Sequence, residues 1–263
     1  ILHVVRCFDN INITHVHDEI DPISDIEIVE KELLLSDLET IRKAKLKVER
    51  ESKSGDKEAH EKYKSLNDLE RELNKGLQSR DLSFVEETSE HFQNLQLITM
   101  KPCLYIANVQ EDDNDNSHLK KLKGYANSKG LPVLTLCNQI EAEIAELGQE
   151  EGLDILKEMG MKEPGLNKLI RKSYEMLHLQ TFFSAEPKEV RAWTIKKGTT
   201  ALQAAGEIHT DFEKGFIKAE TVAYEDFIKH QGELGAKSAG KLRSEGSDYL
   251  VKDGDIIHFR FNV

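Results

Sequence analysis

An amide and a carboxylate three residues apart, Asn108 and Glu111, are the side chains of this sequence best suited to read a ligand. The amide both donates and accepts hydrogen bonds, whereas the carboxylate only accepts them. Together they offer the groups needed to recognise the edge of one planar heterocycle. The same spacing also fits a polar residue that ends a strand, followed by a solvated glutamate.

The residues before Asn108 form an apolar run, Cys103 to Ala107, which follows a proline. Such a run is typical of a strand that is buried on both faces of a parallel sheet. Ligands of open α/β sheets bind at the carboxyl ends of the strands. The sequence therefore predicts that residues 108–111 lie at the binding edge of a sheet.

Two more apolar runs, Ile1 to Phe8 and residues 131–137, predict further buried strands of this sheet. A helix over about residues 117–129 separates the second strand from the third, and an order of strand, helix, strand, helix is that of a doubly wound sheet. Polar loops follow Phe8, Ala107 and Leu136, and they supply a candidate pocket for a nucleoside. The loop after Phe8 also carries His15 and His17.

A phosphate-binding loop is missing from the pattern, because no G-x-x-x-x-G-K-S/T motif occurs in the 263 residues. Whatever holds phosphate and Mg²⁺ must therefore precede Ile1, or the protein does not bind phosphate. The sequence has no initiator Met and begins inside a predicted strand. We therefore expect that an upstream portion is missing.

Composition indicates a globular protein with room for two domains, since 38% of its 263 residues are hydrophobic. A net charge of −12 argues against a protein that coats nucleic acid but leaves a local basic patch open. The three cysteines lie far apart on or beside apolar runs, which predicts reduced thiols and a cytoplasmic location. No apolar run approaches the ~20 residues of a membrane-spanning helix, so we expect a soluble protein without a membrane contact.

Between the first two predicted strands, the sequence predicts an antiparallel coiled-coil hairpin. Asp21-Pro22 opens a helix, and two apolar stripes with steps of four and three residues flank a polar turn at 53–56. Lys45 and Glu70 occupy one position each in these stripes. Such polar breaks either set the alignment of the helices or mark a flexible, partner-facing point.

The segment 42–50 of the hairpin is basic, with five Lys and Arg residues against Glu49. A basic arm on an acidic body is a plausible contact for RNA phosphates or an acidic partner. A solvated helix surface has the same composition, so both interpretations stay open. These five residues are Arg42, Lys43, Lys45, Lys47 and Arg50.

The last third of the chain predicts a small α+β module with a binding or regulatory role. It contains the only tryptophan, Trp193, on the predicted strand 190–195, followed by a predicted helix over 199–209. Residues 251–261 predict a pair of strands turned by Asp253-Gly254.

These residues resemble the YchF/Obg-like ATPase family of P-loop proteins, lacking its amino-terminal portion. The terminal module resembles a TGS domain, a ubiquitin-like β-grasp. The landmarks that carry the resemblance cover most of the chain; they are residues 3–9, Asp21-Pro22, 25–27, Glu32-Leu33, Asp37-Leu38, 108–111, 189–195, 209–216 and 253–263.

The resemblance implies an α/β fold in which a partial P-loop NTPase sheet carries the hairpin and the TGS domain. The implied domains are the nucleotide-binding domain at 1–35 and 99–179, the hairpin insertion at 36–98 and the TGS domain at 180–263. It further implies an ATPase that uses Mg²⁺, with Mg²⁺ ligands upstream, and that binds ribosomes, with the large subunit as the expected contact.

The resemblance also assigns the base-binding residues. Related GTPases read guanine with Asn-Lys-x-Asp, where this chain has Asn108-Val109-Gln110-Glu111. The longer Glu111 would misplace the carboxylate that guanine requires, and Val109 cannot replace the lysine that packs over the base. ATP is therefore the expected nucleotide, with GTP as the alternative. Cys137 and Asn138 stand where the last base-contacting loop of the family lies.

Two roles remain open at this point. Family members have an apolar residue where many GTPases use a water-positioning glutamine, so His15 is a candidate for positioning the attacking water. His15 also fits an ordinary loop histidine, and His17 is a competing candidate.

The protein as a whole is either an ATP hydrolase coupled to ribosome binding or a non-catalytic protein whose conformation is switched by nucleotide binding. Without a P-loop, these 263 residues alone are expected to be inactive.

Overall fold

The computed structural model describes residues 1–16, 19–111, 116–147, 149–185 and 189–262. His17 and the acidic stretch 112–115 lie outside these ranges. The chain divides into two compact units, Ile1–Leu169 and Ile170–Val263. Each unit has its own sheet, and the two are considered separately.

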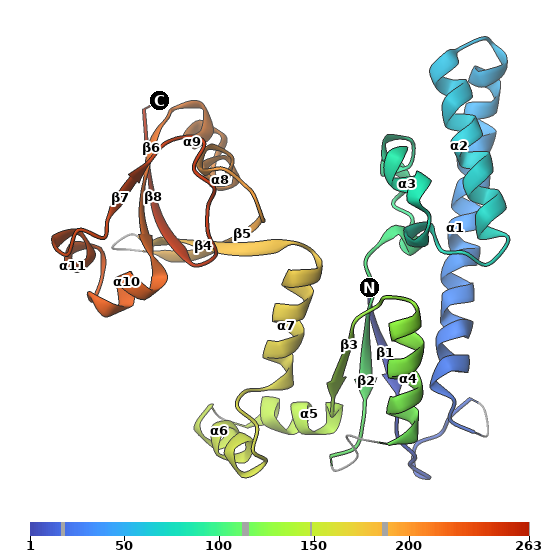
Figure 1. Ribbon diagram of the computed structural model, residues 1–263, viewed down its shortest axis with the longest axis horizontal. Coiled ribbons are helices and arrows are strands. Elements are labelled where there is room, and N and C mark those ends of the chain that lie inside the picture. The colour runs from blue at the N-terminus through green and yellow to red at the C-terminus, as the bar shows by residue number, and fades with distance from the viewer. Residues whose placement is uncertain (17–18, 112–115, 148, 186–188, 263) are drawn as a thin grey trace. The chain divides into compact units, whose positions relative to one another are not determined.

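The first unit is built on a three-stranded parallel sheet in the order β1-β2-β3 (Figure 1). Arg6 pairs with Asn108, and Asn108 pairs with Leu136, so the three strands end at the same edge. The prediction that the loops after these strands begin at one edge is thereby confirmed. The strands are β1 (Leu2–Arg6), β2 (Leu104–Asn108) and β3 (Val133–Leu136).

Helix α4 (Ser117–Ser128) and the first half of α1 (Pro22–Lys53) cover one face of this sheet, where Ile26 and Leu122 pack against Tyr105 and its neighbours. On the opposite face of β1, Leu2 is 46% and Val4 is 53% exposed. The prediction that β1 is a buried strand is therefore wrong for this face, because both covering helices lie on the other side. The doubly wound arrangement, which needs helices on both faces, remains a prediction.

Helix α1 begins as predicted, with Pro22 in its first turn and the Asp21 carboxylate accepting the N–H of Ile23 at 3.2 Å. It continues without a break to Lys53, so the predicted domain boundary at 35/36 falls inside one helix. A turn with Gly55 at φ +94° leads into α2 (Lys57–Leu73), where Asp56 caps the new helix. One helix thus spans both the sheet and the projecting arm.

The two helices pack along the predicted stripes, with Leu38, Ile41, Leu66 and others buried between them. The two polar positions in the stripes meet each other, since Lys45 Nζ lies 2.6 Å from Glu70 Oε2 and both side chains are less than a fifth exposed. Arg42 also donates to Glu70 at 2.9 Å. The polar breaks are therefore satisfied within the hairpin.

The chain returns from α2 to the sheet through short helical turns that are fixed to the hairpin by Asp37. This carboxylate is 2% exposed and accepts the backbone N–H groups of Ile98 and Thr99 at 2.8 and 2.7 Å. The turns are η1 (Ser79–Asp81), α3 (Ser83–Glu87), η2 (Ser89–His91), η3 (Gln93–Leu95) and η4 (Ile98–Met100). After β3 come α5 (Asn138–Glu146), α6 (Gln149–Glu158) and α7 (Gly165–Met176).

The second unit contains a five-stranded mixed sheet in the order β5-β4-β8-β6-β7. β4 runs parallel to β8, and the other neighbouring strands are antiparallel. The strands are β4 (Leu179–Ala185), β5 (Val190–Lys196), β6 (Phe216–Ala223), β7 (Arg243–Glu245) and β8 (Asp255–Phe261). The helices are α8 (Ala201–Ile208), α9 (Thr210–Lys214), α10 (Tyr224–Lys229) and α11 (Glu233–Ser238).

Residues 251–261 do not form the predicted strand pair. Only β8 is a strand, because the residues before it are bonded to β4: Asp253 accepts the N–H of Thr181 at 2.8 Å, and the Val251 carbonyl accepts the side-chain amide of Gln180 at 2.7 Å. The segment before the turn is therefore tied to β4. Among the helices that the structure describes, none has the length and apolar character required to cross a membrane.

Candidate functional site

The loops that follow β2 and β3 are joined by the side chain of Asn108. Its Oδ1 accepts the backbone N–H of Asn138, the first residue of α5, at 3.0 Å. The main chain adds a bond on each side, from the Cys7 N–H to the Asn108 carbonyl (2.8 Å) and from the Val109 N–H to the Leu136 carbonyl (2.9 Å). The carbonyl side of this amide is thus fixed, and its NH₂ group is oriented by it.

The side chains next to this link pack in the core and are not available to contact a ligand. Val109 and Cys7 are both buried in the cluster beneath α1 and α4. Burial raises the pKa of the Cys7 thiol to about 12. A contact from Val109 to a base would therefore come from its backbone.

A cavity of about 690 Å³ opens at the end of β3, between that strand, α5 and the start of α7. It contains two of the predicted residues, Glu111 and Cys137, but Asn108 and His15 are not among its lining residues. The lining comprises Glu111, Thr135, Leu136, Cys137, Ile140, Glu141, Met159, Met161, Gly165 and Lys168.

Glu141 and Gly165 form the inner wall of this cavity. The Glu141 carboxylate accepts the N–H groups of Gly165 and Leu166 at 2.7 and 3.0 Å and so caps the start of α7. A Cβ atom on Gly165 would lie 2.3 Å from Leu136 Cδ2 and 2.6 Å from Glu141 Oε1. Only glycine lets these three groups approach each other, and the cavity keeps its shape for that reason.

The chemistry of the lining suits a flat, nitrogen-rich ring. Cys137, Met159 and Met161 bring polarisable sulfur atoms, which make favourable contacts with aromatic systems. Glu111 and Lys168 place one carboxylate and one ammonium group at the same cavity. A pocket with apolar walls and a few polar groups is the usual form of a small-molecule site.

His15 lies in the loop after β1, and its Nε2 is 3.0 Å from Asp25 Oδ2 in the first turn of α1. Arg6 holds the same loop through bonds to the carbonyls of Phe8, Asn10 and Ile13. The imidazole is therefore oriented by a carboxylate, outside the lining of the cavity.

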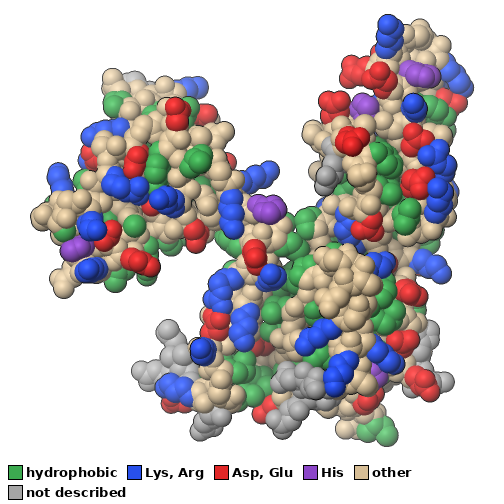
Figure 2. Space-filling view, viewed as in Figure 1, with side chains coloured by type: hydrophobic (Ala, Val, Ile, Leu, Met, Phe, Trp, Pro, Cys, Tyr) green, Lys and Arg blue, Asp and Glu red, His purple; other side chains and the backbone are tan. Residues whose placement is uncertain are grey.

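The basic segment 42–50 is less available than its composition suggests. Arg42 and Lys45 are bonded to Glu70, and Lys43 pairs with Glu39 at 2.6 Å. Figure 2 shows acidic and basic side chains interspersed along the two helices of the hairpin. The segment presents a mixed surface rather than a uniformly basic one.

Sequence reasoning missed most of the cavity wall. Glu141, Met159, Met161, Gly165 and Lys168 come from α5, α7 and the turn after α6, none of which carries a recognisable motif. The one usable signal was Gly165 at the start of an amphipathic helix. Within the described ranges, no three His, Cys, Asp or Glu side chains gather in a way that would hold a metal ion.

Comparison with known proteins identifies relatives along nearly the whole chain. The chain is 48% identical to the Ribosome-binding ATPase YchF of Escherichia coli O157:H7 over 262 residues, which are 99% of this chain and 72% of that protein. It is 48% identical over 267 residues to the protein of the same name from Bacillus subtilis (strain 168), covering 100% of this chain and 73% of that protein.

The fold agrees with these matches. The solved structure of the Schizosaccharomyces pombe YchF GTPase superposes with a TM-score of 0.83 at 32% identity, covering 98% of this chain and 71% of that one. A family model, YchF-GTPase_C, described as "Protein of unknown function (DUF933)", matches residues 179–262. With this fold and nearly half of its residues identical to these relatives, the chain belongs to the YchF family.

Proposed function

We propose that this protein binds and hydrolyses ATP in conjunction with the ribosome, and that the adenine base lies where β2 and β3 end. The names of the bacterial relatives, which are ribosome-binding ATPases, support this assignment. The observation that carries the base site is the bond from Asn138 N–H to Asn108 Oδ1, which fixes the amide beside a cavity large enough for a nucleoside.

The preference for ATP follows from the groups that guanine and adenine present. Guanine offers N–H donors at N1 and N2 and needs a carboxylate at a set distance. The longer side chain of Glu111, together with Val109 in place of a lysine, does not reproduce that arrangement. A mismatched buried polar edge costs about 1–3 kcal/mol, which corresponds to roughly tenfold to hundredfold selectivity.

Calorimetric titration of the complete protein with ATP and GTP tests this preference. ATP should bind roughly tenfold or more tightly than GTP. Equal affinities would contradict the role given to residues 108–111 and would favour GTP as the alternative nucleotide.

The Asn108 link is tested by Asn108→Ala. The variant should bind ATP roughly tenfold to hundredfold more weakly, because alanine offers the base no polar group and cannot accept the N–H of Asn138. Gln139→Ala is the matched control, since Gln139 is an exposed amide on α5 that bonds to Glu143 at 3.1 Å. Equal affinity of the two variants would remove Asn108 from the site.

The described residues form no binding site for phosphate or Mg²⁺. The sequence has no P-loop motif, and the described side chains form no metal-ligand group. They do not fit a bound Mg²⁺, and no step through it is assigned to them. The 263-residue chain by itself should therefore show no ATP hydrolysis in a phosphate-release assay, and turnover by it would refute this.

His15 is proposed to position the attacking water in the complete protein. The Asp25 contact at 3.0 Å supports this role, because a histidine that acts in proton transfer needs a partner that holds its orientation. His15→Ala should lower kcat roughly a hundredfold while KM for ATP changes little. A variant with the normal kcat would exclude the residue.

The ribosome contact is proposed for the hairpin and for the second unit, with the large subunit as the partner and the cytoplasm as the location. The order β5-β4-β8-β6-β7 with α8 on one face supports a β-grasp of the TGS type for residues 180–263. Arg42 and Lys45 are both bonded to Glu70 between the two helices. Lys43 pairs only with the exposed Glu39 on its own helix, so Lys43 and Lys47 are the better residues to test.

Charge reversal of Lys43 and Lys47 to Glu should weaken ribosome binding and reduce the slope of log affinity against log salt by about one for each phosphate that is no longer bound. Lys57→Glu with Lys64→Glu on α2 is the matched control. Equal slopes for all three proteins would leave the arm without a phosphate contact, and a nucleotide-switched protein that grips the ribosome elsewhere would become the better description.

A further inference from the structure

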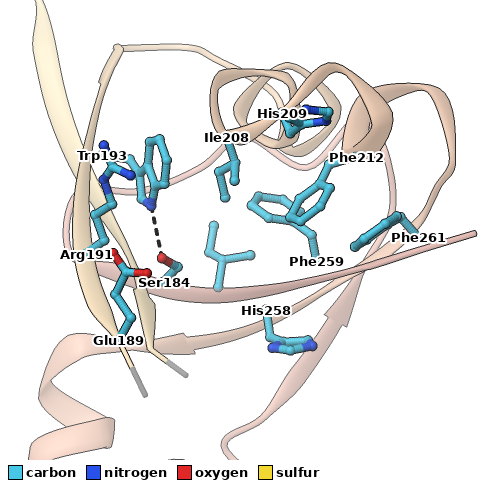
Figure 3. Close-up of a pocket in the computed structure, with 11 residues that line it drawn as sticks. Ser184, Glu189, Arg191, Trp193, Ile208, His209, Phe212, His258, Phe259 and Phe261 are labelled. Carbon is cyan, nitrogen blue, oxygen red and sulfur yellow. Dashed lines mark hydrogen bonds between the residues drawn. The ribbon is translucent and has the colours of Figure 1, made fainter. Parts of the chain in front are cut away.

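A second cavity, of about 400 Å³, lies within the unit Ile170–Val263, on the face of its sheet that carries α8 (Figure 3). Aromatic side chains from β5, α9 and β8 form its walls, and polar side chains of Ser184, Glu189 and Arg191 lie along one side. The lining comprises Ser184, Glu189, Arg191, Trp193, Ile208, His209, Phe212, Ile257, His258, Phe259 and Phe261. It is far in sequence from Asn108 and independent of the proposed base site.

The hollow exists because the sheet face is longer than the helix that covers it. α8 has eight residues, and its alanines Ala201, Ala204 and Ala205 pack against the core that contains Phe182. In the β4–β5 ladder, Phe182 faces Trp193 and the next pair on this face is Ser184 with Arg191. The core ends at the Phe182–Trp193 pair, and the Ser184–Arg191 pair lines the cavity.

The aromatic walls are held in fixed positions. The rings of Phe212 and Phe261 stack with centroids 3.9 Å apart, and the Trp193 ring is anchored by its Nε1–H, which donates to Ser184 Oγ at 2.9 Å. The Arg191 guanidinium lies 4.3 Å from the centroid of the Trp193 ring. Fixed rings of this kind bind a planar ligand by stacking at little cost in side-chain entropy.

The polar groups around the cavity include both hydrogen-bond donors and acceptors. Nδ1 of His209 accepts the N–H of Asp211 at 3.1 Å, so the ring proton of the neutral imidazole is on Nε2. Arg191 adds a charged, planar set of donors, and guanidinium groups match phosphate geometry closely. Glu189 and Ser184 supply acceptors at the Trp193 side. A flat ring with hydrogen-bonding edges and an attached anion complements this set.

We propose that this cavity binds one unpaired nucleotide, with its base against the aromatic wall that Trp193 and the phenylalanine rings form and its phosphate near Arg191. Unpaired bases in single-stranded RNA are recognised by aromatic and guanidinium stacking of this kind. A free mononucleotide presents the same chemistry, and the volume is within the usual range of about 300–1,000 Å³ for ligand pockets.

Trp193 is the only tryptophan of the chain, so its fluorescence reports directly on this cavity. The 263-residue chain is titrated with uridine monophosphate, with uridine, with a short oligouridylate and with the same oligouridylate in an RNA duplex. A saturable change in Trp193 fluorescence is expected with uridine monophosphate, with the single strand or with both, and a weaker one with uridine. Absence of a saturable change with all single-stranded and free ligands overturns the proposal.

The same titrations distinguish a free mononucleotide from a nucleotide within RNA as the ligand. Binding of the mononucleotide and the oligomer with equal affinity identifies a free nucleotide as sufficient. Binding of the oligomer alone identifies a nucleotide within RNA. Equal binding of the duplex shows a contact with the backbone only, and it contradicts a stacked, unpaired base.

Variants with matched controls test the named contacts. Phe212→Ala and Arg191→Ala should each weaken binding by roughly tenfold to hundredfold. Tyr224→Ala and Arg260→Ala are the controls: Tyr224 contacts Phe183, which lies on the other face of β4, and Arg260 pairs there with Glu220. Circular dichroism checks that each variant is folded, and normal affinity in folded Phe212→Ala and Arg191→Ala would refute the site.

Failure of this proposal is distinguishable from failure of the ATP site. Asn108→Ala should leave the response of Trp193 to uridine monophosphate unchanged, because Asn108 belongs to the other unit. Phe212→Ala should likewise leave the calorimetric affinity for ATP unchanged. A response of Trp193 that Asn108→Ala abolishes would show that the signal comes from the first cavity.

Discussion

The two cavities of this molecule differ in how the chain builds them. In the first unit, the walls come from loops and helix ends that follow the parallel strands, and the groups inside are sulfur atoms, two carboxylates and Lys168. In the second unit, the walls are residues of the strands themselves together with α9, and the inside is mainly aromatic. A site at a strand end is shaped by loop geometry, whereas a site on a sheet face is shaped by how far the covering helix extends.

This difference predicts different sensitivities. A strand-end cavity depends on close approaches between backbone segments, such as Gly165 against Leu136, and a single added side chain should close it. A sheet-face cavity depends on ring positions, so removal of one ring should weaken it without closing it. Substitutions in one cavity should leave the other unchanged, and the following predictions use this separation.

The largest effect is expected for Gly165→Leu. The new side chain would occupy the space now taken by Leu136 Cδ2 and the Glu141 carboxylate. Overpacking destabilises a protein by about 1–3 kcal/mol, and this substitution should lie at the upper end of that range. ATP affinity of the complete protein should fall roughly a hundredfold in calorimetry. Gly124→Leu on α4, where an added Cβ meets nothing within 4 Å, is the control. An unchanged ATP affinity in Gly165→Leu would place the base elsewhere.

An intermediate effect is expected at the cysteines. Cys137 is half-buried in the first cavity, whereas Cys7 is fully buried and its pKa is raised to about 12 by burial, so Cys7 carries almost no reactive thiolate at pH 8. Iodoacetamide should therefore modify Cys137 first. ATP at about ten times its Kd should slow this reaction roughly tenfold, as measured by mass spectrometry.

Uridine monophosphate serves as the control in this labelling experiment, since its proposed site lies in the other unit. Equal protection of Cys137 by both nucleotides would show that the two cavities are not chemically distinct. Rapid modification of Cys7 would show that the core beside Asn108 opens in solution.

The smallest effect is a pH dependence confined to the second unit. Tyr249 donates to Asp255 Oδ2 at 2.7 Å, and burial, followed by this bond, raises the pKa of Tyr249 to about 12. A tyrosine whose pKa is raised on folding contributes stability that is complete below its ordinary value near 10 and is lost as pH rises towards 12.

Urea unfolding followed by Trp193 fluorescence at pH 9 and pH 11.5 measures this effect. Between the two values, the free energy of unfolding of the wild-type chain should fall by about 1 kcal/mol more than that of Tyr249→Phe, after allowance for the solvent exposure of the phenol. A fall of equal size in both proteins would assign the alkaline transition to another group.

Local signals predicted much of the first unit. The burial of Cys103 and Ala107, the cap and proline at Asp21-Pro22 and the turn around Gly55 each depend on neighbouring residues only, and the structure has them as expected. The position of Asn108 at the end of β2 was predicted from the same apolar run. Predictions of this kind succeed because the physical cause lies within a few residues.

Long-range partners explain what the sequence did not show. Glu141 and Gly165 meet across 24 residues, and Ser184 and Phe261 line one cavity from opposite ends of the second unit. Asp253 beside a glycine predicts a hairpin turn, but its bond to Thr181 is invisible from the local pattern. Side chains that act together only after folding leave no spacing signal in the chain.

The ion pair between Lys45 and Glu70 has a mechanical consequence. If α2 slid along α1 by one helical turn, both charges would face apolar side chains of the opposite helix, and an uncompensated buried charge is costly. The two helices should therefore keep their register, and the hairpin should behave as a rigid spacer of constant length. Any object that docks at its tip would then be held at a set distance from the sheet, whatever nucleotide is bound.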